Sequence, residues 1–405
     1  MLDLPLNLKP EEFTVEEITA NGTILEKDKP VNFGLPPHQA LERDYFTHFA
    51  LQKRLWNTRD ALAAIARKLG VKPSRFDSAG TKDRNAVTTQ LCSAFAIPPE
   101  RILGVQLPDV AVLGAWKATE KVKLGALGGN KFSMALTAEN CSVTPDAQAI
   151  NRKAAENNFQ FPNYYGSQRF GSLRENTHLA GKLLVENNAE GAVMNYLCFT
   201  SPKEREESTA ARQKLATEKD FTAALGYFPR HLKPERAMLE KLARNPGDWA
   251  GALRTLPRQM QLMLVHAHQS QLFNKTLKAR EEAGLLFSRE TYPACCGENA
   301  LGFPDEEHPA EAGEFLLASV FGSESKPSQW EERFIEREGL QLSAFNLKSF
   351  PELSSKGTLR AACAPLKGFS CEEADGGVTL RFALPPGSYA TVAAEWLLET
   401  LKPVC

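Results

Sequence analysis

The sequence predicts a mixed α/β body that is built from both ends of the chain and interrupted by an α-rich domain. Alternating hydrophobicity marks the first 140 positions, helical periodicity dominates from about residue 173 to 283, and alternation returns near the carboxyl end. The length of 405 residues corresponds to about 2.7 domains of ordinary size. We therefore expect two or three units.

The composition is that of an ordinary globular protein and excludes several classes. Hydrophobic residues make up 42% of the chain, charged residues make up 24%, and the formal net charge is −1. These values exclude a disordered chain and a protein that binds polyanions over its whole surface, so any polyanion site must be a local patch. There is no apolar run of the roughly 18 residues that a membrane span needs and no basic segment of a secretory signal at the amino end. We expect a cytoplasmic protein with no membrane association.

Cysteine and histidine spacing predicts neither a disulfide framework nor a metal site. The eight cysteines include no C-x-x-C pair, and Cys295 and Cys296 are adjacent, which suits neither a zinc knuckle nor an unstrained bridge. His266 and His268 are not part of an H-E-x-x-H motif. We expect reduced thiols, no metal and no cofactor.

Strands and one helix are predicted in the first 140 residues, and a second helix follows. Period-two alternation indicates the strands, and capping residues with a glycine just past the end indicate the first helix. The expected elements are a strand at 45–51, a helix from Asn57 or Thr58 to Gly70, strands at 85–95 and 132–136, and a helix that starts at Thr144, Pro145 and Asp146.

Helices are predicted in the middle of the chain, and strands return at its end. Ser201 and Glu204 have the spacing of a capping box with a proline at the first helical position. The other expected elements are a helix with an apolar stripe from Met260 to Gln271, a loop-rich stretch at 284–330, a strand at 378–382 after an Asp-Gly-Gly turn, and a closing helix at 389–401.

The segment 79–90 combines turn chemistry with a candidate nucleophile. Gly80 permits an unusual backbone angle, and a strand begins directly after Arg84. Asp83 lies between Lys82 and Arg84, whose positive charges favour its carboxylate form and could bind a phosphate. On pattern alone, a solvated charged turn is the more common explanation.

Three further segments carry recognition side chains, each with a structural alternative. In 128–132, Asn130 can read a base edge and Phe132 can stack, although a hairpin start with Phe132 in the core is the commoner arrangement. The aromatic and basic residues of 163–171 suit either a nucleic-acid surface or a hinge of packed aromatics. Tyr389, at the start of the closing helix, is by pattern a core tyrosine.

Together these segments resemble the TruD family of tRNA pseudouridine synthases. The resemblance rests on A-G-T-K-D-R-x-A-V-T-x-Q at 79–90, N-Y-Y-G-S-Q-R-F-G at 163–171, F-T-V-E-E-I at 13–18, G-N-K-F at 129–132 and L-P-P-G-S-Y-A-T at 384–391. A further segment, 267–274, looks like a helix of the family's inserted domain. These motifs occur in family order and extend over almost the full chain.

The resemblance implies an α+β fold in which a mixed or antiparallel pseudouridine-synthase sheet is interrupted by an α-rich insertion, with an RNA cleft between the two. The implied domains are residues 1–162 and 356–405 for the catalytic part and 163–355 for the insertion. The implied activity is isomerisation of a flipped-out uridine, at position 13 of tRNA, without a cofactor. Because an asymmetric cleft can work in a single chain, we expect a monomer.

The resemblance also assigns roles to individual residues. Asp83 is the expected catalytic carboxylate, Phe13, Asn130 and Tyr389 are expected to contact the target nucleotide, and Phe132 is expected to shape its pocket. From the local clusters of basic residues we expect contacts to the RNA backbone from Lys53, Lys82, Arg84 and Arg169.

Two choices stay open at this point. The carboxylate can attack C1′ of the ribose, or it can remove the C2′ proton to give a glycal. A non-catalytic RNA-binding or RNA-folding protein is the alternative to an enzyme. A serine acyl-transfer enzyme through Ser323 and Lys326 is disfavoured, because Pro327 ends any helix there.

Overall fold

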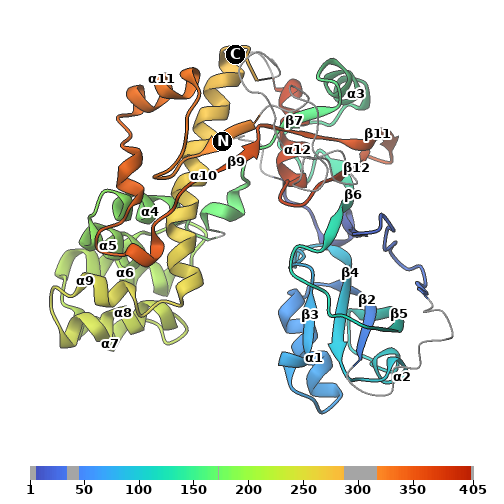
Figure 1. Cartoon of the computed structure of the whole chain (residues 1–405), viewed down its shortest axis with the longest axis horizontal. Helices are drawn as coiled ribbons and strands as arrows, with labels where there is room; N and C mark the ends of the chain where they lie inside the picture. The colour runs from blue at the N-terminus through green and yellow to red at the C-terminus, as the bar shows by residue number, and fades with distance from the viewer. Residues whose placement is uncertain (1–5, 34–44, 172, 287–316, 403–405) are drawn as a thin grey trace. The chain divides into compact units, whose positions relative to one another are not determined.

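The structure is a computed structural model that describes residues 6–33, 45–171, 173–286 and 317–402, and these form two compact units (Figure 1). Described residues up to Asn163 and from Cys363 onward form the first unit, and those from Tyr164 to Ala362 form the second. The chain therefore leaves the first unit and later returns to it. The division into domains 1–162, 163–355 and 356–405 stays a prediction.

An eight-stranded mixed sheet forms the centre of the first unit. Its strands are β1 (Phe13–Thr19), β2 (Phe46–Arg54), β3 (Phe76–Ser78), β4 (Val87–Phe95), β5 (Val110–Ala118), β6 (Leu127–Thr137), β11 (Lys367–Ala374) and β12 (Gly377–Leu384). They lie in the order β11-β12-β6-β1-β4-β2-β5, with β3 paired to β4. The pair β1–β4 is parallel and the other pairs are antiparallel, which confirms the predicted α+β class.

Strands from distant parts of the chain meet in this sheet. β12, near the carboxyl end, pairs with β6 from Gly377 opposite Thr137 to Leu384 opposite Asn130. A smaller pairing joins β7 (Gln160–Pro162) to β10 (Cys363–Pro365). The last segment of the chain is therefore part of the same sheet as the first.

The described part of the first unit also contains the α-helices α1 (Thr58–Lys68), α2 (Pro99–Leu103), α3 (Ala147–Glu156) and α12 (Ala390–Leu398). Asn57 precedes α1 and Gly70 follows it with φ +68°, as predicted. α1 buries Ala61, Ile65 and neighbouring apolar side chains in a core with residues of β2 and β4. The predicted start of α3 is nearly correct: the helix begins at Ala147, because the side chain of Asp146 accepts the backbone N–H of Ala149 and so caps it.

The second unit is mainly helical. Its helices are α4 (Thr177–Val185), α5 (Ala189–Cys198), α6 (Glu206–Glu218), α7 (Phe221–Tyr227), α8 (Lys233–Arg244), α9 (Trp249–Leu253), α10 (Arg258–Glu282) and α11 (Gln329–Glu338). α10 is the long helix of Figure 1 and contains the predicted stripe from Met260 to Gln271. It packs closely on α4, since a Cβ at Gly181 would lie 1.9 Å from the carbonyl oxygen of Leu264.

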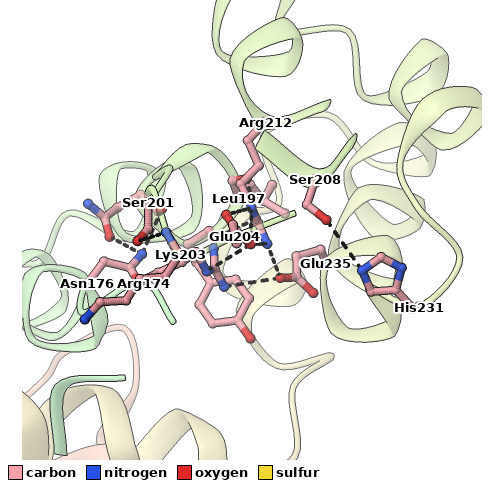
Figure 2. A network of polar contacts seen from close by, with 12 residues as sticks. Arg174, Asn176, Leu197, Ser201, Lys203, Glu204, Ser208, Arg212, His231 and Glu235 are labelled. Atoms are coloured by element: carbon pink, nitrogen blue, oxygen red, sulfur yellow. Dashed lines mark hydrogen bonds and ion pairs between the residues drawn. The ribbon is translucent and has the colours of Figure 1, made fainter. Parts of the chain in front are cut away.

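The predicted capping box at Ser201 is wrong, and a buried ionic network explains why (Figure 2). α6 begins at Glu206, and residues 202–204 form a turn. The carboxylate of Glu204 instead accepts two hydrogen bonds of 3.1 Å from Nε of the fully buried Arg212. Arg212 also donates to Glu235 at 2.8 Å and to the carbonyl oxygen of Leu197. A buried guanidinium needs such partners, and this tertiary requirement overrides the local capping signal.

The prediction of a loop-rich stretch at 284–330 is only partly testable. Residues 287–316, with Cys295 and Cys296, lie outside the described residues, as does Cys405. Within the described part, β8 (Leu317–Val320) pairs with β9 (Thr358–Ala361) and α11 begins at Gln329, while residues 321–328 between them form turn and loop as predicted. The cysteines at 92, 141, 198 and 371 are free thiols. No helix in the described ranges is both long and apolar enough to span a membrane.

Candidate active site

The segment that carries Asp83 is a loop held in place by buried hydrogen bonds. It connects β3 to β4, and Nε2 of Gln90 donates to the carbonyl oxygen of Gly80 at 3.2 Å. The hydroxyl of Thr58, at the start of α1, accepts the backbone N–H of Lys82 at 3.0 Å and donates to Oε1 of Gln90 at 2.8 Å. Since Thr58 and Gln90 are both buried, these contacts fix the loop to α1 and β4.

A buried ion pair attaches the loop to a third element. Nζ of Lys82 lies 2.5 Å from Oε2 of Glu17 on β1, and the two side chains are 6% and 0% exposed. Oε1 of Glu17 accepts the backbone N–H of Leu91 at 3.0 Å, so the carboxylate joins β1, β4 and the loop. Because both charges are removed from water, loss of either partner would leave an uncompensated buried charge and destabilise the fold.

Lys53 of β2, the strand that flanks β4 on the side opposite β1, also holds the loop. Its Nζ, on a side chain that is almost fully buried, donates to the carbonyl oxygen of Asp83 at 2.8 Å and to that of Lys82 at 3.3 Å. Burial lowers the pKa of Lys53 to about 8, and the negative charge of Asp83 offsets part of this effect. The backbone of Asp83 is thus fixed by a cation.

The side chain of Asp83 is exposed, in contrast to its anchored backbone. The neighbouring cations, expected to surround this carboxylate, have other partners: Lys82 pairs with Glu17, and Nε of Arg84 donates to the carbonyl oxygen of Leu55 at 3.1 Å. The burial of Lys53 and Lys82 argues against their predicted contacts to RNA phosphates. For Arg84, which is exposed, the RNA contact stays a prediction.

One row of residues runs across the sheet beside the loop. Phe382 of β12 lies opposite Phe132 of β6, Phe132 opposite Val15 of β1, Val15 opposite Thr88 of β4, and Thr88 opposite Lys53 of β2. Residues opposite each other in neighbouring strands project from the same face of a sheet. Phe132 and Lys53 therefore lie on one face.

Other predicted site residues share this face. Phe13 and Glu17 lie two positions on either side of Val15, and Asn130 lies opposite Glu17. Because Glu17 and Lys53 both reach the Asp83 loop, the loop covers the face that carries Phe13, Asn130 and Phe132. The first unit by itself therefore brings the predicted catalytic residue and three predicted substrate-binding residues to one side of the sheet.

The aromatic residues on this face are largely buried against each other. The ring centroids of Phe13 and Phe132 lie 6.1 Å apart with the planes 20° from parallel, and those of Phe132 and Phe382 lie 5.8 Å apart. Phe132 is thus a core residue, as the structural alternative predicted. Oδ1 of Asn130 is buried and has no hydrogen-bond partner among the residues that the structure describes.

Tyr389 reaches the same end of the sheet through β12. Leu384, the last residue of β12, lies opposite Asn130, and Tyr389 follows five residues later as the N-cap of α12. Gly387, with φ +84°, makes the turn between strand and helix. Tyr389 is half-buried.

The residues 163–171 belong mainly to the second unit, where their aromatic side chains are packed. The hydroxyl of Tyr164 donates to Glu281 at 2.7 Å, and Phe170 is buried. Nε of Arg169 donates to Oγ of Ser270 at 3.1 Å, and its guanidinium lies over the ring of Tyr165. The structure favours the packed-aromatic alternative, and the predicted RNA contact of Arg169 stays a prediction.

The serine acyl-transfer alternative receives no support from the geometry. Ser323 lies in a turn and Lys326 in the irregular segment that leads to α11, and Oγ of Ser323 donates to the carbonyl oxygen of Ser355 at 3.3 Å. No helix of the described chain places this serine and lysine on one face, as the S-x-x-K arrangement requires.

Comparison with known proteins shows which family the chain belongs to. The sequence profile described as "tRNA pseudouridine synthase D (TruD)" matches residues 5–395. The chain belongs to the TruD family. This confirms the resemblance that the motifs predicted.

Relatives and a solved structure agree with this assignment over most of the chain. A probable tRNA pseudouridine synthase D of Methanosarcina mazei is 34% identical over 372 residues, which cover 84% of each chain. One of Methanococcus maripaludis is 32% identical over 395 residues, covering 97% of this chain and 94% of the relative. The crystal structure of the putative TruD of Methanosarcina mazei superimposes with a TM-score of 0.73 at 31% identity, covering 98% of this chain and 94% of that one.

The residues that support the Asp83 loop of this TruD protein were missed in the sequence. Glu17, Thr58 and Gln90 were not predicted to belong to the site, and Lys53 and Lys82 were expected to contact RNA. A signal was present, because Glu17 falls at a buried position of the alternating F-T-V-E-E-I strand. A charged residue on the buried face of a strand needs a charged partner.

A metal centre is not evident at this site. Among the described residues there is no group of three or more histidine, cysteine, aspartate or glutamate side chains that could hold a metal ion.

The buried Lys53 gives a prediction for the pH dependence of stability. Its pKa is about 8 in the folded protein against 10.5 for an ordinary lysine, so between these values the unfolded chain binds more protons. The free energy of unfolding should therefore rise with pH in this window through Lys53, by up to about 1.4 kcal/mol per pH unit. Urea unfolding at several pH values should show that Lys53→Met removes this rise.

The exposed Lys72 provides the control, because its change to methionine should leave the pH dependence of unfolding as in the wild type. An unchanged slope in Lys53→Met would contradict the assignment.

Proposed function

We propose that this protein is a tRNA pseudouridine synthase that isomerises uridine to pseudouridine, with position 13 of the tRNA as the target and Asp83 as the catalytic carboxylate. The observation that carries the proposal is the Asp83 loop, whose backbone is anchored while its carboxylate is exposed. Membership in the TruD family and relatives named tRNA pseudouridine synthase D support it.

The proposed reaction breaks the N1–C1′ bond and forms a C5–C1′ bond in the same nucleotide. The carboxylate of Asp83 either attacks C1′, giving an ester with the sugar and a uracil anion, or removes the C2′ proton, giving a glycal. In both routes the uracil turns before C5 bonds to C1′. As that bond forms, the ester route releases the Asp83 carboxylate from C1′, and in the glycal route Asp83 returns the proton to C2′. The C5 proton then leaves to water and N1 carries a proton in the product.

The loop suits this chemistry because it is anchored through its backbone atoms, whereas the proposed reacting group is the side chain of Asp83. Lys53 holds the carbonyl oxygen of Asp83, and Thr58 holds the N–H of Lys82, so the two contacts restrain the backbone while Asp83 itself is exposed. A reacting group held in one position loses little entropy in the transition state.

The sheet face beside the loop suits a flipped pyrimidine. Extrusion of a nucleotide costs a few kcal/mol, and contact with aromatic side chains returns part of this cost. Phe13 and Phe132 provide an apolar wall. Oδ1 of Asn130, which has no partner in the described part of the chain, could accept the N3–H of uracil. Tyr389 borders the same end of the sheet and completes the proposed set of substrate contacts.

Tritium release is the direct test of the proposal. A tRNA transcript labelled at C5 of uracil should lose label to water when incubated with the protein, because C5 loses its hydrogen in the product. A transcript with cytidine at position 13 should release much less label. We also propose that the protein acts in the cytoplasm as a monomer, and the reaction should proceed without an added cofactor. Folded protein that binds tRNA but releases no label would contradict the proposal and favour a non-catalytic RNA-binding protein.

A further inference from the structure

An exposed leucine lies beside the Asp83 loop. Leu124, in the turn between β5 and β6, is 86% exposed, whereas Leu173, the next most exposed large apolar side chain in the described ranges, is 56% exposed. Single apolar side chains on a surface are common and need no explanation by themselves. Leu124 is of interest because its turn is attached to the Asp83 loop and borders a cavity.

The turn that carries Leu124 is attached to the Asp83 loop. The backbone N–H of Gly125 donates to the carbonyl oxygen of Ala79 at 2.7 Å, and that of Val122 donates to Oγ of Ser93 on β4 at 3.0 Å. The N–H of Ala126 closes the turn on the carbonyl oxygen of Lys123. Leu124 is therefore held at a fixed position relative to the loop.

A cavity of about 470 Å³ separates Leu124 from the loop. Leu124 forms part of one wall, and Gly80 and Thr81, the latter two residues before Asp83, form part of another. Arg59, Lys121 and Lys123 also line it, and so does Asp77, whose Oδ1 lies 4.0 Å from Nζ of Lys121. Arg59 has no acidic partner among the residues that the structure describes, so its charge is available to a phosphate.

We propose that Leu124 is a wedge that enters the base stack of the RNA at the position that the target nucleotide leaves, while Arg59 contacts a phosphate beside it. This inference rests on the proposed function. A flipped nucleotide leaves a gap in the stack, and proteins that unstack bases insert apolar side chains such as leucine. A leucine on a closed turn is already in position and loses little freedom when it enters the gap.

A wedge and a structural side chain differ in their expected effect on the stability of the protein without RNA. The side chain of Leu124 is almost fully exposed, so Leu124→Ala removes little buried contact and should leave the unfolding temperature unchanged. A loss of activity in this variant would then have to arise in the complex with RNA.

The first experiment compares Leu124→Ala with Leu103→Ala, which truncates a 48% exposed leucine on α2 in the same unit. On a folded, C5-tritiated transcript, Leu124→Ala should lower kcat/KM by about ten-fold or more, the scale of one lost base contact. On a transcript with an abasic residue next to the target, where the target is already poorly stacked, the loss should fall to within about three-fold. Leu124→Phe should restore activity on the folded transcript, and Leu103→Ala should behave as the wild type.

The second experiment does not depend on catalysis. In an Asp83→Ala background, 2-aminopurine next to the target nucleotide should change its fluorescence when protein binds, and Leu124→Ala should remove most of that change. Equal signals with and without Leu124, or an equal loss of activity on both transcripts, would overturn the wedge. Absence of tritium release by the wild type would instead overturn the proposed enzyme, and the fluorescence would still decide whether Leu124 enters the stack.

Discussion

Replacing Asp83 by asparagine should abolish pseudouridine formation, with kcat/KM for tritium release lowered by roughly 10³-fold or more, as when other catalytic nucleophiles are removed. The fold should persist, because Lys53 holds the main-chain carbonyl oxygen of Asp83 and the substitution leaves that atom in place. Affinity for tRNA should stay within a few-fold of the wild type, since the side chain adds one contact to a large RNA surface.

Asp60→Asn is the matched control, because Asp60 is an exposed carboxylate in the first turn of α1 in the same unit. It should leave tritium release and the unfolding temperature as in the wild type. Retention of more than a tenth of the activity in Asp83→Asn would show that another group carries the reaction.

The buried ion pair between Lys82 and Glu17 should give the largest effect on stability. Lys82→Met leaves a buried carboxylate without its cation, and Glu17→Gln leaves a buried ammonium without its anion. Each change should destabilise the first unit by about 3–5 kcal/mol. The double variant should lose clearly less than the sum, because neither charge is then left alone. Urea-dependent hydrogen exchange of the amides of β1 and β4 would measure these free energies in the first unit alone.

An exposed pair in the same sheet serves as the control. Nη1 of Arg381 on β12 lies 2.8 Å from Oε2 of Glu372 on β11, and the two side chains are 42% and 63% exposed. Arg381→Met should cost no more than about 1 kcal/mol. Additive losses in the Lys82 and Glu17 double variant would mean that the two charges do not depend on each other. The single variants should also lower kcat, since a loosened loop no longer holds Asp83 in place.

Local patterns predicted most of the elements of the fold. The alternation at 45–51 and 378–382 belongs to β2 and β12, and the helical stripe from Met260 to Gln271 belongs to α10. The failures have tertiary causes. Glu204 has the spacing of a capping residue but is bound by Arg212, and no local rule contains that contact.

The site residues divide in the same way, into those that local motifs predicted and those whose position depends on tertiary contacts. Short contiguous motifs identified the family and predicted Asp83 and Asn130 as site residues. The ion pair of Lys82 with Glu17 depends on the parallel register of β1 and β4, which joins two distant parts of the chain. The burial of Lys53 depends likewise on where the loop crosses the sheet. The charge pattern along the sequence predicted RNA contacts for these two lysines, but it contains no information on strand register and so could not predict their burial.

The pairing of β6 with β12 has a consequence for how the protein is made. When β6 leaves the ribosome, its partner in the finished sheet begins 240 positions downstream of Thr137, at Gly377. At about 5–20 residues per second, that delay is roughly 12 to 48 seconds. Throughout this interval the edge of β6 that β12 will cover has no partner strand from β12, and an open strand edge of this kind is where a chain can pair wrongly with another.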